Sequence, residues 1–132
     1  LAETAAEFVR SQRWPVEAIV PVPPSRETRV FQPLQILARA LGESLGIPVQ
    51  SDCIAKTRST PELKSVTAYD ERLKLLDGAY AVFAKPIIGR KVLLLDDLYR
   101  SGATLKAAYS TIAKSGVSEV YVLAITKTRV KR

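Results

Sequence analysis

Residues 91–105, KVLLLDDLYRSGATL, constrain the fold of this chain more than any other stretch. Four consecutive apolar residues at positions 92–95 predict a buried strand, and a helical pattern follows at about residues 103–115. Residues 119–126, EVYVLAIT, are a second apolar run, which is typical of a strand covered on both faces of a parallel sheet. The succession of strand, helix and strand predicts an α/β fold with a mostly parallel central sheet flanked by helices.

The other segments of the chain fit the same fold class. Helices are predicted at residues 1–13, 33–45 and 70–76, and strands at residues 18–23, 47–54 and 78–83. Residues 55–72 carry many charges and little apolar periodicity, which predicts a long loop. The length of 132 residues suits one compact domain, so residues 1–132 are expected to form a single domain. Because the chain begins at Leu1 and contains no Met, we interpret it as a domain cut from a longer protein, or as a chain whose first residues are missing.

Composition excludes some functions and favours others. No apolar run approaches the ~20 residues of a membrane-spanning helix, and the chain has no His to serve as a metal ligand or a general base. The single cysteine, Cys53, excludes an internal disulfide, is expected to be a buried strand residue, and fits a reducing, cytoplasmic setting. The net charge of +7 favours nucleic acid or polyphosphate ligands, although a solvated basic surface carries the same charge without a partner.

The two aspartates and the small loop that follow residues 92–95 predict a site for a sugar phosphate. Ligands of parallel α/β sheets bind at the carboxyl ends of the strands, where Asp96 and Asp97 lie. Residues 101–104, Ser-Gly-Ala-Thr, stand at the start of a helix, where free N–H groups and the helix dipole favour a phosphate. The carboxylates can accept hydrogen bonds from the vicinal hydroxyls of a ribose, or hold Mg²⁺ through water.

Two other interpretations of the acidic pair are weaker. An apolar strand that ends in Asp-Asp also resembles a Walker B strand, but the chain contains no G-x-x-x-x-G-K-[ST] loop. Alternatively, the aspartate at the strand end caps the next helix and has no ligand. This interpretation accounts for one aspartate, but not for two adjacent ones before a loop of small residues.

Residues 91–105 resemble the phosphoribosyl-pyrophosphate (PRPP) motif of the type I phosphoribosyltransferases. Two more segments are similar to the ComF-like branch of that family, which is named for a competence protein and has members fused to helicases. These segments are residues 21–32, PVPPSRETRVFQ, and residues 57–82, TRSTPELKSVTAYDERLKLLDGAYAV. The resemblance extends over about residues 18–126 and implies the Rossmann-like fold of the family with a small or reduced hood.

The resemblance also implies a role for each part of the site, although it names no catalytic residue. Asp96 and Asp97 would hold the ribose hydroxyls, and a Mg²⁺ ion through water or the ribose. The 5-phosphate would be bound by Arg100, Ser101, Gly102, Ala103 and Thr104, and the pyrophosphate by a loop with Pro24, Ser25, Arg26 and Arg29. The cationic candidates of a flexible loop at residues 56–69 are Lys56, Arg58 and Lys64.

Some of these assignments have open alternatives. A solvated surface charge explains Lys56, Arg58 and Lys64 equally well. Tyr99 and Arg100 stand where the family has an aliphatic and a small residue, and Arg100 either binds phosphate or points to solvent. Phe8, Trp14 and Tyr99 are candidates for stacking on a base, while core packing is the better explanation for Phe8 and Trp14.

Two functions follow from the resemblance. The first is a Mg²⁺-dependent phosphoribosyltransferase that moves the 5-phosphoribosyl group of PRPP to a nitrogen acceptor, nucleobase-like or amine, and releases pyrophosphate. The second is a non-catalytic module that senses PRPP or a nucleotide, or that works beside nucleic acid in a DNA uptake or helicase system. The basic residues 127–132 and the relatives fused to helicases favour the second function. PRPP or a ribonucleotide is the expected ligand, nucleic acid is a further partner through the basic tail or a fused domain, and a homodimer is usual among relatives.

Overall fold

The computed structural model describes residues 1–23, 33–56, 80–96 and 103–125. Its elements are α1 (Ala2–Gln12), β1 (Ala18–Pro21), α2 (Pro33–Leu45), β2 (Ile54–Lys56), β3 (Tyr80–Val82), β4 (Lys91–Asp96), α4 (Ala103–Ala113) and β5 (Glu119–Ala124). The short helix predicted at residues 70–76 lies outside the described residues. That the whole chain forms one domain stays a prediction.

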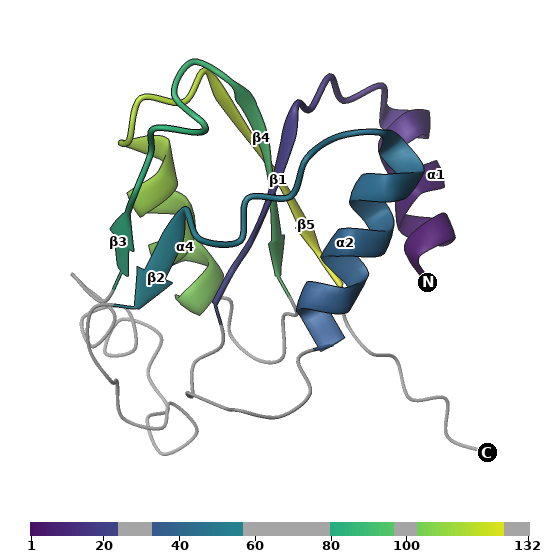
Figure 1. Ribbon diagram of the computed structural model, residues 1–132, viewed down its shortest axis with the longest axis horizontal. Helices are drawn as coiled ribbons and strands as arrows, with labels where there is room; N and C mark the ends of the chain where they lie inside the picture. Colours follow the sequence, from purple (N-terminus) through teal and green to yellow (C-terminus); the bar gives the residue numbers. More distant parts are fainter. Residues whose placement is uncertain (24–32, 57–79, 97–102, 126–132) are drawn as a thin grey trace.

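The main sheet has three parallel strands in the order β1-β4-β5, which confirms the mostly parallel sheet (Figure 1). The central strand β4 is the apolar run that ends in the acidic pair. Its register aligns Leu94 with Val20 of β1 and with Val122 of β5. Strands β2 and β3 form a separate antiparallel pair.

The strand predicted at residues 47–54 is wrong as one continuous element. Residues 48–50 lie along the free edge of β1, where Ile19 N–H donates to Pro48 O at 2.9 Å and Gln50 N–H donates to Ile19 O at 2.8 Å. The chain then turns at Ser51 and Asp52, and β2 begins at Ile54. Pro48 has no N–H to give to a ladder, so this stretch can pair only briefly.

Alternating side chains of the sheet bury two cores, one on each face. Ile19, Leu93 and Leu95 pack with α1 and α2 on one face. Val20, Val92 and Leu94 pack on the other face, against α4 and the β2–β3 pair. The helices therefore cover both sides of the sheet (Figure 1), as the apolar runs predict.

Trp14 belongs to the core that α1 and α2 cover, as packing predicts. Its ring lies 5.3 Å from that of Tyr121 and makes an edge contact with Phe8 at 5.6 Å between centroids. Phe8 itself is 43% exposed, so core packing is wrong for this residue, which touches Trp14 at the surface.

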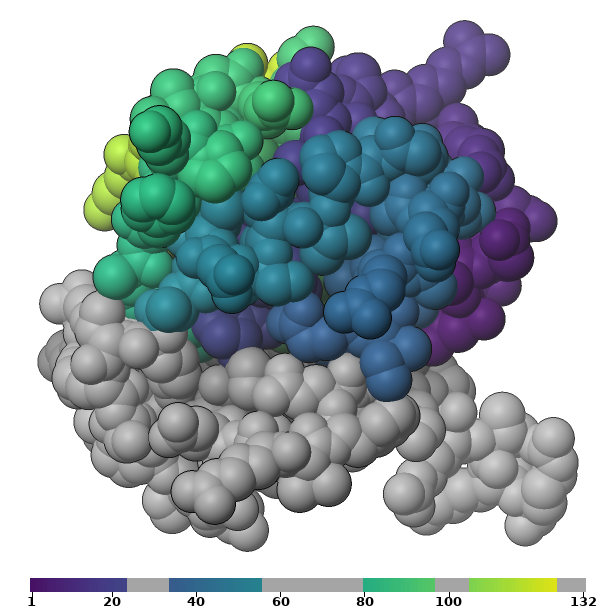
Figure 2. All heavy atoms as spheres, viewed as in Figure 1, coloured from purple at the N-terminus to yellow at the C-terminus, as the bar shows by residue number. Residues whose placement is uncertain are grey.

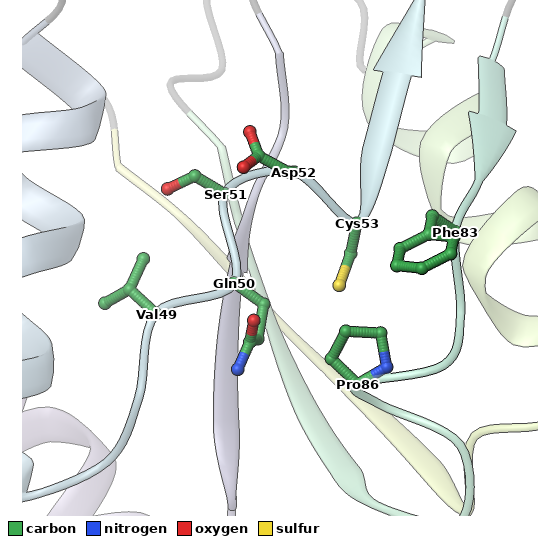
Figure 3. Close-up of a pocket in the computed structure, with 7 residues that line it drawn as sticks. All are labelled: Val49, Gln50, Ser51, Asp52, Cys53, Phe83 and Pro86. Carbon is green, nitrogen blue, oxygen red and sulfur yellow. The ribbon is translucent and has the colours of Figure 1, made fainter.

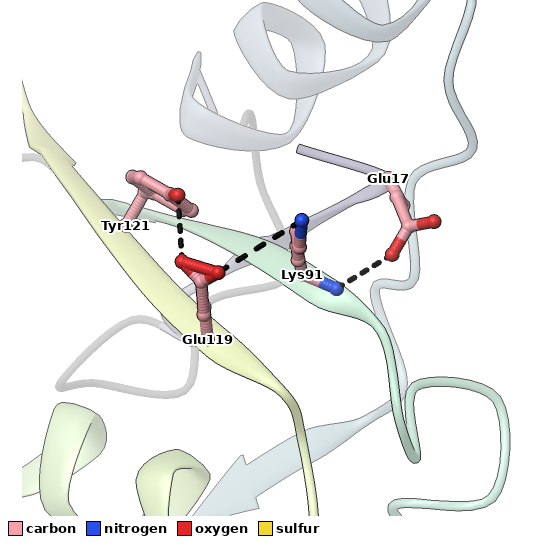
Figure 4. A network of polar contacts seen from close by, with 4 residues as sticks. All are labelled: Glu17, Lys91, Glu119 and Tyr121. Carbon is pink, nitrogen blue, oxygen red and sulfur yellow. Dashed lines mark hydrogen bonds and ion pairs between the residues drawn. The ribbon is translucent and has the colours of Figure 1, made fainter. Parts of the chain in front are cut away.

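A polar cluster lies at the amino edge of the sheet, where β1, β4 and β5 begin (Figure 4). Lys91 N–H donates to Glu17 Oε1 at 2.8 Å, and Glu17 N–H donates to Lys91 O at 2.7 Å. Lys91 Nζ lies 3.9 Å from Glu119 Oε2, and the Tyr121 hydroxyl donates to Glu119 Oε1 at 2.8 Å. These contacts are exposed and contribute little energy each, but they join β1, β4 and β5 at one end.

Gly42 allows α2 to approach the segment beside β1. A Cβ at this position would lie 2.8 Å from both Ile47 O and Val49 Cγ2, which is closer than such atoms pack. Ile47 N–H also donates to Gly42 O at 3.0 Å. This hydrogen bond keeps the backbone of Ile47, and with it the Ile47 carbonyl, close to Gly42. Helix propensity alone would favour alanine here by about 1 kcal/mol.

We expect Gly42→Ala to lower the free energy of unfolding by about 1–3 kcal/mol, because overpacking outweighs the gain in propensity. Urea unfolding followed by circular dichroism measures this difference. A more stable variant, as propensity alone predicts, would show that α2 and residues 47–49 are less closely packed.

Candidate functional site

The carboxyl ends of the three parallel strands meet at one edge of the sheet. Pro21 aligns with Leu95, and Asp96 aligns with Ala124. Val22 N–H donates to Leu95 O and Ile125 N–H donates to Asp96 O, both at 2.8 Å, so the alignment continues past the ends of β1 and β5. This is the edge at which open parallel sheets bind their ligands.

Asp96 is the last residue of β4 and the only buried charged residue in the described part of the chain. It is 8% exposed. By the alternation of the strand it shares the face of Val92 and Leu94, which is the face that α4 covers. Asp96 therefore lies beside the apolar core, at the edge of the sheet where parallel α/β proteins bind their ligands.

The helix α4 begins at Ala103, and residues 97–102 alone separate it from Asp96. Ala103 and Thr104 therefore stand in the first turn of a helix at this edge, as the sequence predicts. The first N–H groups of a helix have no partner within it and carry the positive end of its dipole. Such a helix start next to a buried carboxylate offers one place for an anion and one for hydroxyl groups.

Tyr80 is a buried polar residue that the sequence did not single out. It begins β3, is 6% exposed, and lies in the same core cluster as Val92 and Leu94. Burial raises the pKa of its phenol, and the negative charge of Asp96 raises it further. The sequence contained one signal for this residue: a tyrosine within a short apolar strand places a polar hydroxyl in a core.

Most of the predicted ligand residues lie outside the described residues. These are Pro24, Ser25, Arg26, Arg29, Arg58, Lys64, Asp97, Arg100, Ser101 and Gly102. Tyr99 lies outside as well. Lys56 is the last residue of β2. The structure therefore places Asp96 and the start of α4 at one edge of the sheet, and the roles of all these residues stay predictions.

Within residues 1–23, 33–56, 80–96 and 103–125, no group of three acidic, Cys or His side chains could hold a metal ion by itself. The carboxylate of Asp96 is nevertheless the kind of oxygen ligand that Mg²⁺ prefers. Mg²⁺ commonly binds through one or two carboxylates together with phosphate oxygens of the substrate. The site therefore fits an ion that arrives with a phosphorylated ligand.

A separate pocket of about 430 Å³ lies beside the edge strand β1 (Figure 3). Its lining residues are Val49, Gln50, Ser51, Asp52, Cys53, Phe83 and Pro86. The thiol of Cys53 points toward Pro86, and the Ser51 hydroxyl donates to Gln35 Oε1 at 2.9 Å. Neither Asp96 nor Tyr80 lines this pocket.

Cys53 is buried, as predicted, although it precedes β2 and is not part of a strand. Burial raises the pKa of its thiol, and the nearby charge of Asp52 adds to the effect. Since the thiolate is the reactive form, we expect Cys53 in the folded chain to react with a disulfide reagent at pH 8 at least about tenfold more slowly than in urea. Equal reaction rates in the folded chain and in urea would contradict the burial of Cys53. The Cys53→Ser variant, which has no thiol, is the control for background reaction of the reagent.

No family model matches the chain. In sequence it is similar to competence protein F of Haemophilus influenzae, with 28% identity over 115 residues. The match covers 84% of this chain and 50% of that protein, so the chain spans half the length of this relative.

Solved structures with the same fold include enzymes that handle PRPP or transfer phosphoribosyl groups. The glutamine PRPP amidotransferase from B. subtilis, complexed with ADP and GMP, has a TM-score of 0.62 at 17% identity, over 93% of this chain and 25% of that one. The adenine phosphoribosyltransferase from Leishmania tarentolae has a TM-score of 0.60 at 15% identity, over 95% of this chain and 55% of that one. The chain thus has the fold of the type I phosphoribosyltransferases, and its sequence is similar to their ComF-like branch.

Proposed function

We propose that this chain binds PRPP and transfers its 5-phosphoribosyl group to a nitrogen acceptor, with release of pyrophosphate. The observation that carries the proposal is the buried carboxylate of Asp96 at the carboxyl end of β4, directly before a helix that begins at Ala103. Similarity to competence protein F and the shared fold with phosphoribosyltransferases support it.

Each group at this edge has a task in the proposed reaction. The carboxylate of Asp96 accepts hydrogen bonds from the ribose hydroxyls, and Asp97 is proposed to do the same. The first turn of α4 binds the 5-phosphate through backbone N–H groups, with Ser101 and Thr104 as proposed hydroxyl donors. Arg26 and Arg29 are proposed to bind the pyrophosphate. Together these contacts hold the ribose so that its anomeric carbon is open to attack.

In the reaction, the acceptor nitrogen forms a bond to the anomeric carbon while the bond from that carbon to the pyrophosphate oxygen breaks. The electron pair leaves with pyrophosphate, and the acceptor gives up a proton to water. When bound, Mg²⁺ would neutralise the charge that builds on the leaving group. The chain has no His, so the acceptor must be nucleophilic without a histidine base.

A second candidate is a module that binds PRPP or a nucleotide without turnover, or that associates with nucleic acid in DNA uptake. The name of the similar competence protein and the net charge of +7 favour it. Independently of which candidate holds, we propose a cytoplasmic location and a homodimer. For PRPP we propose Arg100 as a ligand of the 5-phosphate, and Lys56, Arg58 and Lys64 as the cationic residues of the flexible loop. No described helix is both long and apolar enough to cross a membrane.

Calorimetric titration of PRPP into the chain, with and without Mg²⁺, tests the proposal. Binding that Mg²⁺ strengthens is the expected result, and a panel of bases and amines is then assayed for pyrophosphate release. Binding without release from any acceptor would favour the sensing module. Absence of PRPP binding, together with salt-dependent binding of DNA, would replace the proposal with the nucleic-acid function.

A further inference from the structure

The pocket beside β1 is lined by residues that lie far apart in the sequence, namely residues 49–53 on one hand and Phe83 with Pro86 on the other. These two parts of the chain meet on the face of the molecule that Figure 2 shows, the first in teal and the second in green. The volume of the pocket, about 430 Å³, falls within the range of about 300–1,000 Å³ that is common for small-molecule sites. The pocket can therefore hold one ring-shaped molecule.

Backbone hydrogen bonds hold two sides of the pocket in place without a ligand. Gln50 N–H donates to Ile19 O at 2.8 Å, which fastens one side to β1. Phe83 N–H donates to Cys53 O at 2.8 Å, so these two residues keep a fixed spacing. Because little of the lining has to be ordered when a ligand enters, less of the binding free energy is lost.

One side of the pocket is apolar and presents an exposed aromatic ring. Phe83 is 63% exposed, whereas Cys53 is buried. In Figure 3 the Phe83 ring lies on one side of Cys53 and Pro86, and the Gln50 side chain lies on the other. A flat ring seated against Phe83 and Pro86 would remove their apolar surface from water, and two aromatic rings also attract each other. This side of the pocket therefore suits a planar ligand.

The other side of the pocket offers a side-chain amide. Gln50 is half-buried, and its side chain has no hydrogen bond to any residue in the described part of the chain. A primary amide donates through its N–H groups and accepts through its oxygen. It can thus form two hydrogen bonds at once with an acceptor and a donor that stand next to each other on the edge of a heterocycle.

The charge of the lining disfavours phosphorylated ligands. Among the lining residues, all of which the structure describes, Asp52 alone carries a charge. Its carboxylate repels a phosphate at this place, although the net charge of the chain is +7. The pocket therefore differs in its preference from the proposed PRPP site, which is built for anions.

We propose that this pocket is a binding site for a flat, uncharged heterocycle with adjacent N–H and C=O groups on its edge, such as a cyclic imide. The ring packs against Phe83 and Pro86, and its edge forms hydrogen bonds with the Gln50 amide. No covalent bond forms or breaks. This inference does not rest on the proposed function, because neither Asp96 nor α4 lines the pocket.

Uracil is the probe, because it is flat and uncharged and has adjacent N–H and C=O groups. It is titrated into the ¹⁵N-labelled chain, and the backbone amide resonance of Cys53 reports that the pocket is occupied. A dissociation constant on the order of 1 mM is expected for a ligand with so few atoms. Uridine monophosphate is expected to act on this resonance at least about fivefold more weakly, because Asp52 repels its phosphate.

Two substitutions test the two sides of the pocket. Gln50→Ala removes the amide, and Phe83→Ala removes the exposed ring, and each is expected to weaken uracil binding about tenfold. Gln12→Ala is the matched control, since Gln12 is an exposed glutamine of α1 that does not line the pocket. It is expected to bind uracil as the parent does. The dispersion of the amide resonances shows that each variant is folded.

A Cys53 resonance that stays in place at about 10 mM uracil overturns the inference, because a fragment-sized site would then be largely occupied. Uracil binding by Gln50→Ala and Phe83→Ala equal to that of the parent overturns it as well. Equal binding of uridine monophosphate overturns the preference for unphosphorylated rings. If uracil shifts the Cys53 resonance while PRPP binds nowhere, the proposed function fails and this second site stands.

Discussion

Replacement of Asp96 by asparagine is expected to weaken PRPP binding about 100-fold or more and to leave the fold intact. Asparagine has the same shape but no charge, and it turns one acceptor oxygen into a donor. Two charge-assisted hydrogen bonds from the ribose would be lost or reversed, each worth about 1.5–3 kcal/mol. Asp96 is the only buried carboxylate among the described residues. None of the other described carboxylates is therefore expected to replace it as a ligand of the ribose.

Calorimetric titration measures the loss of PRPP affinity in Asp96→Asn, and circular dichroism checks that the variant is folded. Asp52→Asn is the matched control, since Asp52 is an exposed aspartate that lies in the turn before β2. It is expected to bind PRPP as the parent does. Asp97→Asn is expected to resemble Asp96→Asn, as the ribose assignment requires. If Asp96→Asn binds PRPP normally, the carboxylate does not hold the ribose and the site must be sought elsewhere.

Truncation of Leu94 to alanine is expected to have the largest effect on stability, about 3–5 kcal/mol of unfolding free energy. Leu94 is fully buried in the middle of the central strand, between Val20 and Val122. It packs in the core that α4, β2 and β3 cover. Strands held on both sides cannot move to fill the cavity, so little of the loss is recovered.

Urea unfolding of the Leu94→Ala variant, compared with Leu1→Ala, checks this expectation. Leu1 is 76% exposed, so the same truncation there is expected to change the free energy of unfolding by less than about 0.5 kcal/mol. A loss below about 1 kcal/mol for Leu94→Ala would mean that the two faces of the sheet are not closely packed.

The sequence by itself determined those helices and strands that a pattern of neighbouring residues predicts. The apolar runs around positions 92–95 and 119–126 predicted two parallel strands, and β4 and β5 are those strands. Burial on both faces is confirmed for β4 and is wrong for β5, which ends the described sheet order and is only half-buried. The prediction of a helix at residues 33–45 matches α2, because a leucine stripe with proline at its start and glycine after its end is a complete helix signal. The position of Asp96 at a strand end was equally readable, since it follows directly from the end of the apolar run.

Only the tertiary structure decided what depends on contacts between distant segments. The division of residues 47–54 follows from pairing with β1 on one side and with β3 on the other, which no local pattern encodes. Glycine at position 42 is unfavourable by helix propensity alone, but the close approach of Ile47 and Val49 leaves no room for a Cβ there. Tyr80 is buried because the β2–β3 pair packs against the same core as Val92 and Leu94 of β4. Periodicity reports which face of an element is buried, whereas the partner buried against it is fixed only when the whole chain packs.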